Sequence, residues 1–195
     1  MSTPRITPKG EARRDALQDA VVRVLERGGP GAVTHRAVAA EAGVPVAAAT
    51  YYFATLDDLL VSALLRTAES QAALFASVST GAHDGAPGRA ASLRELATLL
   101  YEWTHTERSS AIAQYELFFL AMRRDALRAA AEQWYSALEG AVAAAGYAER
   151  ASTIALAIDG LLLRMLWRGE SESIDGIEAT LTEIVGAPQH PRSPA

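Results

Sequence analysis

The stretch "EAGVPVAAATYYF", residues Glu41 to Phe53, decides how the first part of this sequence is interpreted. It reads as the end of one helix, a tight turn at Gly43 and a second short helix that begins near Pro45. Two short helices joined in this way, behind a longer supporting helix, form a helix-turn-helix pattern. The second helix of that pattern enters the major groove of DNA, and its alanines would let the backbone approach the bases closely. Alanine also favours helices in general, so the pattern alone leaves both interpretations open.

The spacing of apolar residues predicts helices nearly throughout the chain and no convincing strand. Thr34 is a candidate N-cap, and "TLDD" (Thr55–Asp58) is similar to a capping box. "STGAHDGAPGRA" (Ser79–Ala90) predicts a loop because it is rich in glycine and proline. The fold class is therefore all-α, with about nine helices near residues 10–28, 35–42, 45–52, 55–77, 91–106, 108–122, 125–145, 149–168 and 174–186.

The composition indicates an ordinary soluble protein of one or two domains, with 195 residues, half of them apolar and about a fifth charged. The absence of cysteine excludes disulfides and cysteine-ligated metals and fits a reducing cytoplasm. The N-terminus lacks the apolar segment of a signal peptide. The longest apolar run, Ile154–Trp167, is too short to span a membrane and contains Asp159 and Arg164. We therefore expect a cytoplasmic protein without a membrane partner.

The charges are distributed unevenly along the chain. The net charge is −5, yet residues 1–58 contain seven basic and seven acidic side chains, so the acidic excess lies in the remainder. Four cations stand within the first fourteen residues, which form a basic arm (Arg5, Lys9, Arg13 and Arg14). This asymmetry suggests two surfaces with different partners, although a solvated tail would have the same composition.

The segment "VTHRAVAAEAGVPVAAATYYFATLDDLL" (Val33–Leu60) resembles the DNA-binding domain of TetR/AcrR-family transcriptional regulators. The similarity covers roughly residues 10–60 and includes the threonine that opens the first short helix, the "VAAEAGV" turn and the acidic start of the following helix. The resemblance implies an N-terminal helix-turn-helix domain over residues 1–54, a helical ligand-binding and dimerisation domain over 55–187, and a disordered tail over 188–195.

The resemblance also implies which residues meet DNA. Leu56 stands where many relatives have a phosphate-binding lysine, and Thr50 stands where many have an aromatic residue. The basic arm could replace the missing cation. Ala42, Ala49 and Phe53 are better interpreted as core. The predicted DNA-contacting residues are Thr34, Arg36, Val46, Ala47, Ala48, Thr50, Tyr51 and Tyr52, together with Arg13 and Arg14 of the arm.

The resemblance places a small-molecule cavity among the later helices, which are rich in large side chains. Most of these aromatics could equally fill a core. Glu116 and Arg164 interrupt apolar stretches, so they could orient a polar ligand group, pair with each other or face solvent. The predicted ligand-binding residues are Tyr101, Trp103, Tyr115, Glu116, Phe119, Met122, Trp134 and Arg164.

The helix over residues 149–168 is apolar on nearly all sides, which predicts that it is covered in a homodimer together with the helix over 174–186. A monomer that buries this helix in its own core is the alternative. The sequence has no catalytic motif, no metal-ligand spacing among its histidines and no cofactor-binding motif. We therefore predict a regulator, not an enzyme: a repressor that a small apolar or aromatic effector releases from its double-stranded DNA operator. The alternative is a small-molecule-binding helical dimer with weak or lost specific DNA binding.

Overall fold

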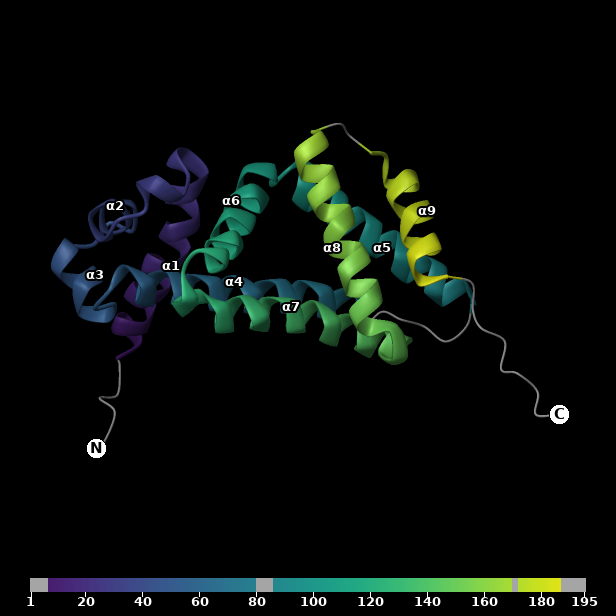
Figure 1. Ribbon diagram of the computed structural model, residues 1–195, viewed down its shortest axis with the longest axis horizontal. Coiled ribbons are helices and arrows are strands. Elements are labelled where there is room, and N and C mark those ends of the chain that lie inside the picture. Colours follow the sequence, from purple (N-terminus) through teal and green to yellow (C-terminus); the bar gives the residue numbers. More distant parts are fainter. Residues whose placement is uncertain (1–6, 80–85, 170–171, 187–195) are drawn as a thin grey trace. The chain divides into compact units, whose positions relative to one another are not determined.

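The computed structural model describes residues 7–79, 86–169 and 172–186, and their side chains except for 76–79 and 86–90. Within these residues every regular element is a helix, which confirms the predicted fold class (Figure 1). The predicted disordered tail 188–195 and Arg5 of the basic arm lie outside them, as do residues 80–85 of the predicted loop. The elements are α1 (Pro8–Gly28), η1 (Pro30–Ala32), α2 (His35–Glu41), α3 (Val46–Tyr52), α4 (Leu56–Ser79), α5 (Ala86–His105), α6 (Arg108–Phe119), η2 (Leu120–Met122), η3 (Asp125–Leu127), α7 (Arg128–Val142), η4 (Ala143–Tyr147), η5 (Ala148–Arg150), α8 (Ala151–Arg168) and α9 (Ile174–Val185).

The chain forms two compact units, and neither is continuous in sequence. The first unit consists of the chain up to Gln71 together with Ser109–Ala137. The second consists of Ala72–Arg108 and the chain from Leu138 onward. The helices α4 and α7 are therefore divided between the two units. The first unit contains α1 to α3, which form the helix-turn-helix part of the molecule.

Local hydrogen bonds define the helix-turn-helix as the sequence predicted. The Thr34 hydroxyl accepts a hydrogen bond from the Ala37 backbone N–H at 3.1 Å, which caps α2. Gly43 turns the chain with a φ of 67°, a left-handed conformation that favours glycine. At the start of α4, the Asp58 N–H donates to the Thr55 hydroxyl at 3.0 Å and the Thr55 N–H donates to the Asp58 carboxylate at 2.9 Å. These reciprocal bonds complete the predicted capping box.

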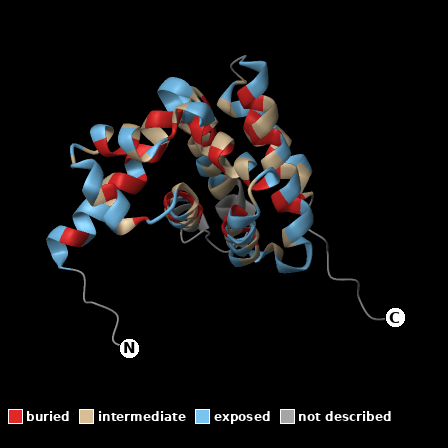
Figure 2. Cartoon of the chain, turned by 60° about the vertical axis from the view of Figure 1, so that its left-hand side comes forward, coloured by how far each residue is buried: buried red, intermediate tan, exposed pale blue. Residues whose placement is uncertain are grey.

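The core of the first unit joins α1 to α4 with α6 and the start of α7. Figure 2 shows buried residues on one side of these helices and exposed residues on the other. Ala49 and Phe53 are buried, as expected, and Ala42 is partly buried against them. The same core cluster includes Leu17, Val21, Leu25, Val38, Leu59, Leu64, Leu117, Leu127 and Trp134.

Some helix boundaries differ from those predicted. The helix predicted over residues 108–122 consists of α6, which ends at Phe119, and the 3₁₀ turn η2. The helix α5 begins at Ala86, within the predicted loop, because Pro87 lies in the first turn, where a missing N–H leaves no helical partner unsatisfied. The helix expected over residues 125–145 consists instead of η3, α7 and a π-helical turn. It ends at Gly146, whose φ of 93° is outside the helical range.

In the second unit, α9 packs against α5 and α8, and α5 also packs against α8. The Arg150 guanidinium donates to the Val185 and Ile184 carbonyls at 2.8 and 3.1 Å, which satisfies the C-terminal end of α9. The Arg108 guanidinium donates in the same way to the Leu166 carbonyl near the end of α8. Within the described parts of the chain, no helix is both long and apolar enough to cross a membrane.

Candidate functional site

The exposed face of α3 is the first candidate site. Val46 and Tyr51 are 45% and 80% exposed, and Ala47 and Thr50 are exposed beside them. The three- and four-residue spacing of these positions puts them on one side of the helix, while Ala49 is buried on the other. A short helix that exposes one face from a packed support has the geometry needed to enter the major groove.

Contacts with α1 and α2 hold α3 in place. The Val44 N–H donates to the Ala39 carbonyl at 3.0 Å across the turn, and His35 Nε2 lies 2.9 Å from the Phe53 carbonyl at the end of α3. Glu41 pairs with Arg27 and, at 2.7 Å, with Arg23, both on α1. These guanidiniums, Arg27 first, lower the pKa of the Glu41 carboxyl. The ion pairs therefore connect the end of α2 to the supporting helix.

The polar groups on the α3 face are few. The Thr50 hydroxyl lies 3.2 Å from the Ala47 carbonyl and 3.4 Å from the Val46 carbonyl, so its proton is directed back to its own helix. Tyr51 stands edge-to-face with the half-buried Tyr52, with ring centroids 5.2 Å apart. The face thus offers methyl groups, one exposed tyrosine and one hydroxyl that remains able to accept a hydrogen bond.

The cations of the N-terminal helices differ in their partners. Lys9, Arg13, Arg14 and Arg36 are all exposed, as is the N-cap Thr34. Arg14 is engaged within the chain: its guanidinium carbon lies 6.0 Å from the centroid of the Phe53 ring and it donates to the Ser62 hydroxyl at 3.4 Å. Arg14 would have to leave these partners to reach a phosphate.

A cation that the sequence analysis missed lies at the first turn of α4. Leu56 is partly buried against the core. The neighbouring Asp57 pairs with Arg124, which comes from the segment after α6. A guanidinium thus stands beside the position where the sequence lacks a lysine. No local signal could have indicated this, because the pair joins residues far apart in the chain.

Three of the predicted ligand-binding residues lie together in the first unit. The Tyr115 ring centroid is 5.8 Å from that of Phe119 and 6.3 Å from that of Trp134. Phe118, which the sequence analysis did not single out, lies 5.8 Å from Trp134. Tyr115 and Trp134 are buried, whereas Phe119 is at the border of exposure. Met122 lies in η2 and is 73% exposed.

The two candidate charges, Glu116 and Arg164, lie in different units and do not pair. Arg164 pairs with Glu172 at 2.8 Å within the second unit. Glu116 lies beside Gly29 at the end of α1, where partial burial raises the pKa of its carboxyl. Of the remaining candidates, Trp103 is buried in the second unit, and Tyr101 stacks on His105 with ring centroids 4.2 Å apart. Among the described residues, no group of three or more histidine, aspartate or glutamate side chains could hold a metal ion.

A helix-turn-helix with a free recognition face, followed by further helices, defines the class of helical DNA-binding regulators. Two family models match the chain. Residues 17–63 match the bacterial regulatory proteins of the tetR family, and residues 87–187 match the tetracyclin repressor-like C-terminal domain. The chain belongs to the TetR family and is a DNA-binding transcriptional regulator. This membership confirms the predicted resemblance and places the chain among regulators rather than enzymes.

Solved structures agree with this assignment. The multidrug binding protein EbrR in complex with imidazole is 34% identical, with a TM-score of 0.72 over 90% of this chain and 96% of that one. The EbrR complex with ethidium is 34% identical, with a TM-score of 0.71 over 88% and 97%. A TetR-family member from Streptomyces coelicolor A3, SCO1917, is also 34% identical, with a TM-score of 0.71 over 90% and 99%. Among curated protein sequences, none matches the chain significantly.

Proposed function

We propose that this regulator is a repressor that binds an operator through α3 and leaves it when an apolar or aromatic small molecule binds. The proposed DNA binding is supported by the exposed face of α3. Val46 and Tyr51 are exposed on it, while Ala49 is buried in the core. Removing large apolar side chains from water is favourable in free energy, so such a face is suited to a binding partner. The alanine methyls permit close approach to the groove and contact with thymine methyls.

The proposed DNA contacts divide into base readout and phosphate binding. Tyr51, Thr50 and the Val46 and Ala47 side chains would read base edges, and Ala48 and Tyr52 would lie beside them. Arg13, Arg36 and the Thr34 hydroxyl would bind phosphate or a base edge, and Arg14 would join them on leaving Phe53. Because few of the α3 side chains donate hydrogen bonds, DNA deformability contributes a large share of the specificity.

The ligand part rests on the aromatic residues and on the similarity to EbrR. Structures of EbrR contain ethidium, malachite green and proflavin, which are aromatic molecules. The aromatic cluster of Tyr115, Phe119 and Trp134 offers rings of the kind that such molecules stack on. Tyr101, Trp103 and Met122 are further candidates, and Glu116 and Arg164 are the candidate charges that orient a polar group.

The proposed release needs an element that responds to both sites. The helix α4 meets this need because its residues belong to both compact units. A ligand releases DNA only if it binds the DNA-incompetent conformation more tightly than the competent one, since equal affinity for both shifts nothing. We infer that tilting of α4 changes the separation of the two recognition helices of a dimer.

We also propose that α8 and α9 form the homodimer interface. Leu156 and Trp167 are 60% and 75% exposed and stand eleven residues apart, which is three helical turns. Gly160, which is exposed, and Leu163, which is partly buried, fall on the same stripe. An apolar stripe of this kind is expected at a contact between two copies. Trp167→Asp should shift the sedimentation of the protein from dimer to monomer, whereas Met122→Asp, an exposed residue of the first unit, should not.

The DNA proposal is tested by gel retardation with the DNA upstream of the gene itself, with and without ethidium or proflavin. Tyr51→Ala and Arg36→Ala should each weaken operator binding by about 1–3 kcal/mol, and Arg128→Ala, an exposed arginine on α7, should not. Operator affinities within twofold of wild type for both Tyr51→Ala and Arg36→Ala would overturn the assignment. Ligand binding without any sequence preference for DNA at moderate salt would support the alternative, a helical dimer that has lost specific DNA binding.

A further inference from the structure

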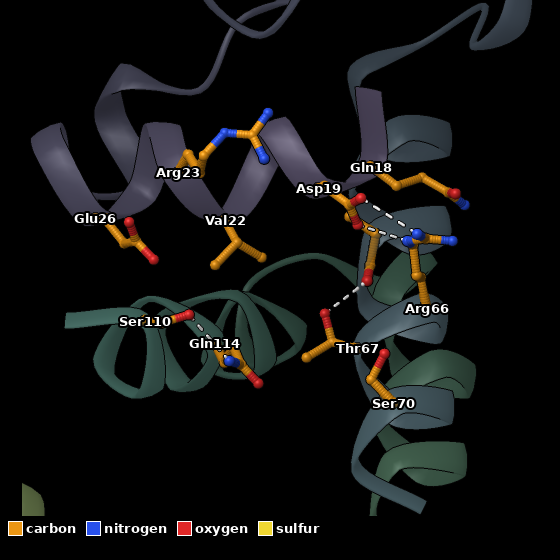
Figure 3. A pocket seen from close by; sticks show the side chains of 11 residues that line it. Gln18, Asp19, Val22, Arg23, Glu26, Arg66, Thr67, Ser70, Ser110 and Gln114 are labelled. Atoms are coloured by element: carbon orange, nitrogen blue, oxygen red, sulfur yellow. Dashed lines mark hydrogen bonds and ion pairs between the residues drawn. The ribbon is translucent and has the colours of Figure 1, made fainter. Parts of the chain in front are cut away.

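A polar cleft of about 260 Å³ lies within the first unit, where α1, α4 and α6 meet (Figure 3). Nine of the eleven residues that line it are polar or charged, and only Val22 and Ala63 are apolar. The cleft is separate from the α3 face and from the aromatic cluster, because none of their residues lines it. It is therefore distinct from both sites of the function proposed above.

The charges in the cleft are paired on one side and unpaired on the other. Asp19 accepts hydrogen bonds from Arg66 at 2.6 and 3.2 Å across the α1–α4 edge. The Arg23 guanidinium turns away from the cleft, toward its partner Glu41. Glu26 points from α1 toward α6, as Figure 3 shows, and no cation of the cleft pairs with it. One carboxylate thus remains available to an occupant.

The charged side chains that line the cleft balance in number but not in pairing. Two carboxylates, Asp19 and Glu26, stand with two guanidiniums, Arg23 and Arg66. Asp19 pairs with Arg66, and Arg23 pairs with Glu41 outside the lining, so Glu26 is the lining carboxylate that these ion pairs leave over. A cation gains from contact with Glu26, whereas an anion would be repelled by it.

The uncharged polar groups of the cleft offer hydrogen-bond acceptors. The Thr67 hydroxyl donates to the Ala63 carbonyl at 2.8 Å, so its lone pairs face outward. Gln114 donates to the Ser110 hydroxyl at 3.2 Å and accepts from Gln71 at 3.1 Å, which fixes the orientation of its amide. Ser70 contributes a further hydroxyl from α4. A ligand with several N–H donors can bond to these acceptors and to Glu26 at the same time.

The size of the cleft limits the ligand. Its volume of about 260 Å³ lies just below the roughly 300–1,000 Å³ of sites for drug-sized molecules, which favours a small ligand. A short alkyl chain with an ammonium group at each end has the right size, and Val22 and Ala63 can contact its methylenes.

We propose that the cleft binds a small organic cation with several N–H donors, such as an aliphatic diamine. Such a ligand would touch α1, α4 and α6 together and so stabilise the unit that carries α3. Because the carboxylates are solvent-accessible, we expect a dissociation constant on the order of 1 mM that rises with salt.

The test is a titration of the full-length ¹⁵N-labelled protein with 1,4-diaminobutane, followed by NMR. Saturable shifts should appear at the backbone amides of Ser70, Ser110 and Gln114. Glu26→Gln should raise the dissociation constant about fivefold or more. Glu11→Gln, which removes the same charge from the first turn of α1 outside the cleft, should leave it within twofold. The neutral analogue 1,4-butanediol should not bind.

A second variant tests the location of the binding site without any change of charge. Ser70→Trp places a large ring in the cleft from an exposed position of α4, and it should abolish the saturable shifts while the rest of the spectrum is retained. Equal weakening by Glu26→Gln and Glu11→Gln would mean general charge attraction and would overturn the proposal. Binding of 1,4-butanediol with similar affinity, or saturable shifts confined to other helices, would overturn it as well.

Discussion

Replacement of Leu117 in α6 by alanine should destabilise the unit that contains the recognition helix. Leu117 is fully buried, in the same core cluster as Leu17, Val21 and Leu64. It lies far from α3 in the sequence, in the part of the chain that family resemblance assigns to ligand binding. Its contribution to the α3-bearing unit is therefore a specific consequence of the tertiary structure.

The magnitude follows from the buried side chain. Leucine to alanine removes three carbon atoms, which at about 0.8 kcal/mol each lowers the free energy of unfolding by about 2.4 kcal/mol. A fully enclosed site adds a cavity term, because the surrounding helices relax only partly. The expected total loss is about 3–4 kcal/mol.

The assay is urea unfolding at fixed protein concentration, combined with amide hydrogen exchange in α1. Met122→Ala is the control, since Met122 is 73% exposed in the adjoining η2 and should change stability by less than about 0.5 kcal/mol. Leu117→Ala should speed exchange at the α1 amides that are protected in the wild type. Unchanged protection of α1, or a loss below about 1 kcal/mol, would refute the placement of α6 in this core.

Three further predictions concern single residues. Thr55→Ala removes one half of the capping box at α4 and should cost about 1 kcal/mol, seen as a melting temperature lower by about 2–4 °C. Gly43→Ala meets open space, so only the left-handed backbone is penalised, and the free energy of unfolding should fall by about 1–2 kcal/mol; an unchanged value would contradict this. Burial raises the pKa of Glu116, so the folded state loses stability as pH rises through that raised pKa, while no penalty exists below the pKa of the unfolded chain. Glu116→Gln should therefore match wild type near pH 4 and become the more stable protein toward pH 7; a difference that does not grow with pH would contradict the placement of Glu116.

The sequence predicted the elements of this fold well because their determinants are local. The Thr34 cap, the Gly43 turn and the Thr55–Asp58 box each involve residues within a few positions of one another. The start of α5 was misjudged for a local reason too. Proline and glycine favour loops on average, yet proline is also compatible with the first turn of a helix.

The candidate sites were harder to predict from the sequence, because the residues that contact one another there are distant in the chain. The exposure of the α3 face followed from the family pattern, but the contacts that engage Arg14 are with the Phe53 ring and with Ser62 in α4. Arg164 and Glu116 both stood out as charges in apolar stretches. Periodicity could not show that one pairs with Glu172 and the other lies beside Gly29.

The sequence by itself determined that the chain is helical, where most helices begin and end, and which short helix presents a free face. Those properties depend on hydrogen bonds and apolar spacing over one or two turns. Only the tertiary structure decided that α6 and the start of α7 complete the core around α1 to α4, and that Arg124 stands beside Asp57. The existence of the cleft between α1, α4 and α6 also depends on the tertiary structure. Its walls are three helices separated along the chain, and which of them meet depends on the packing of many apolar side chains at once.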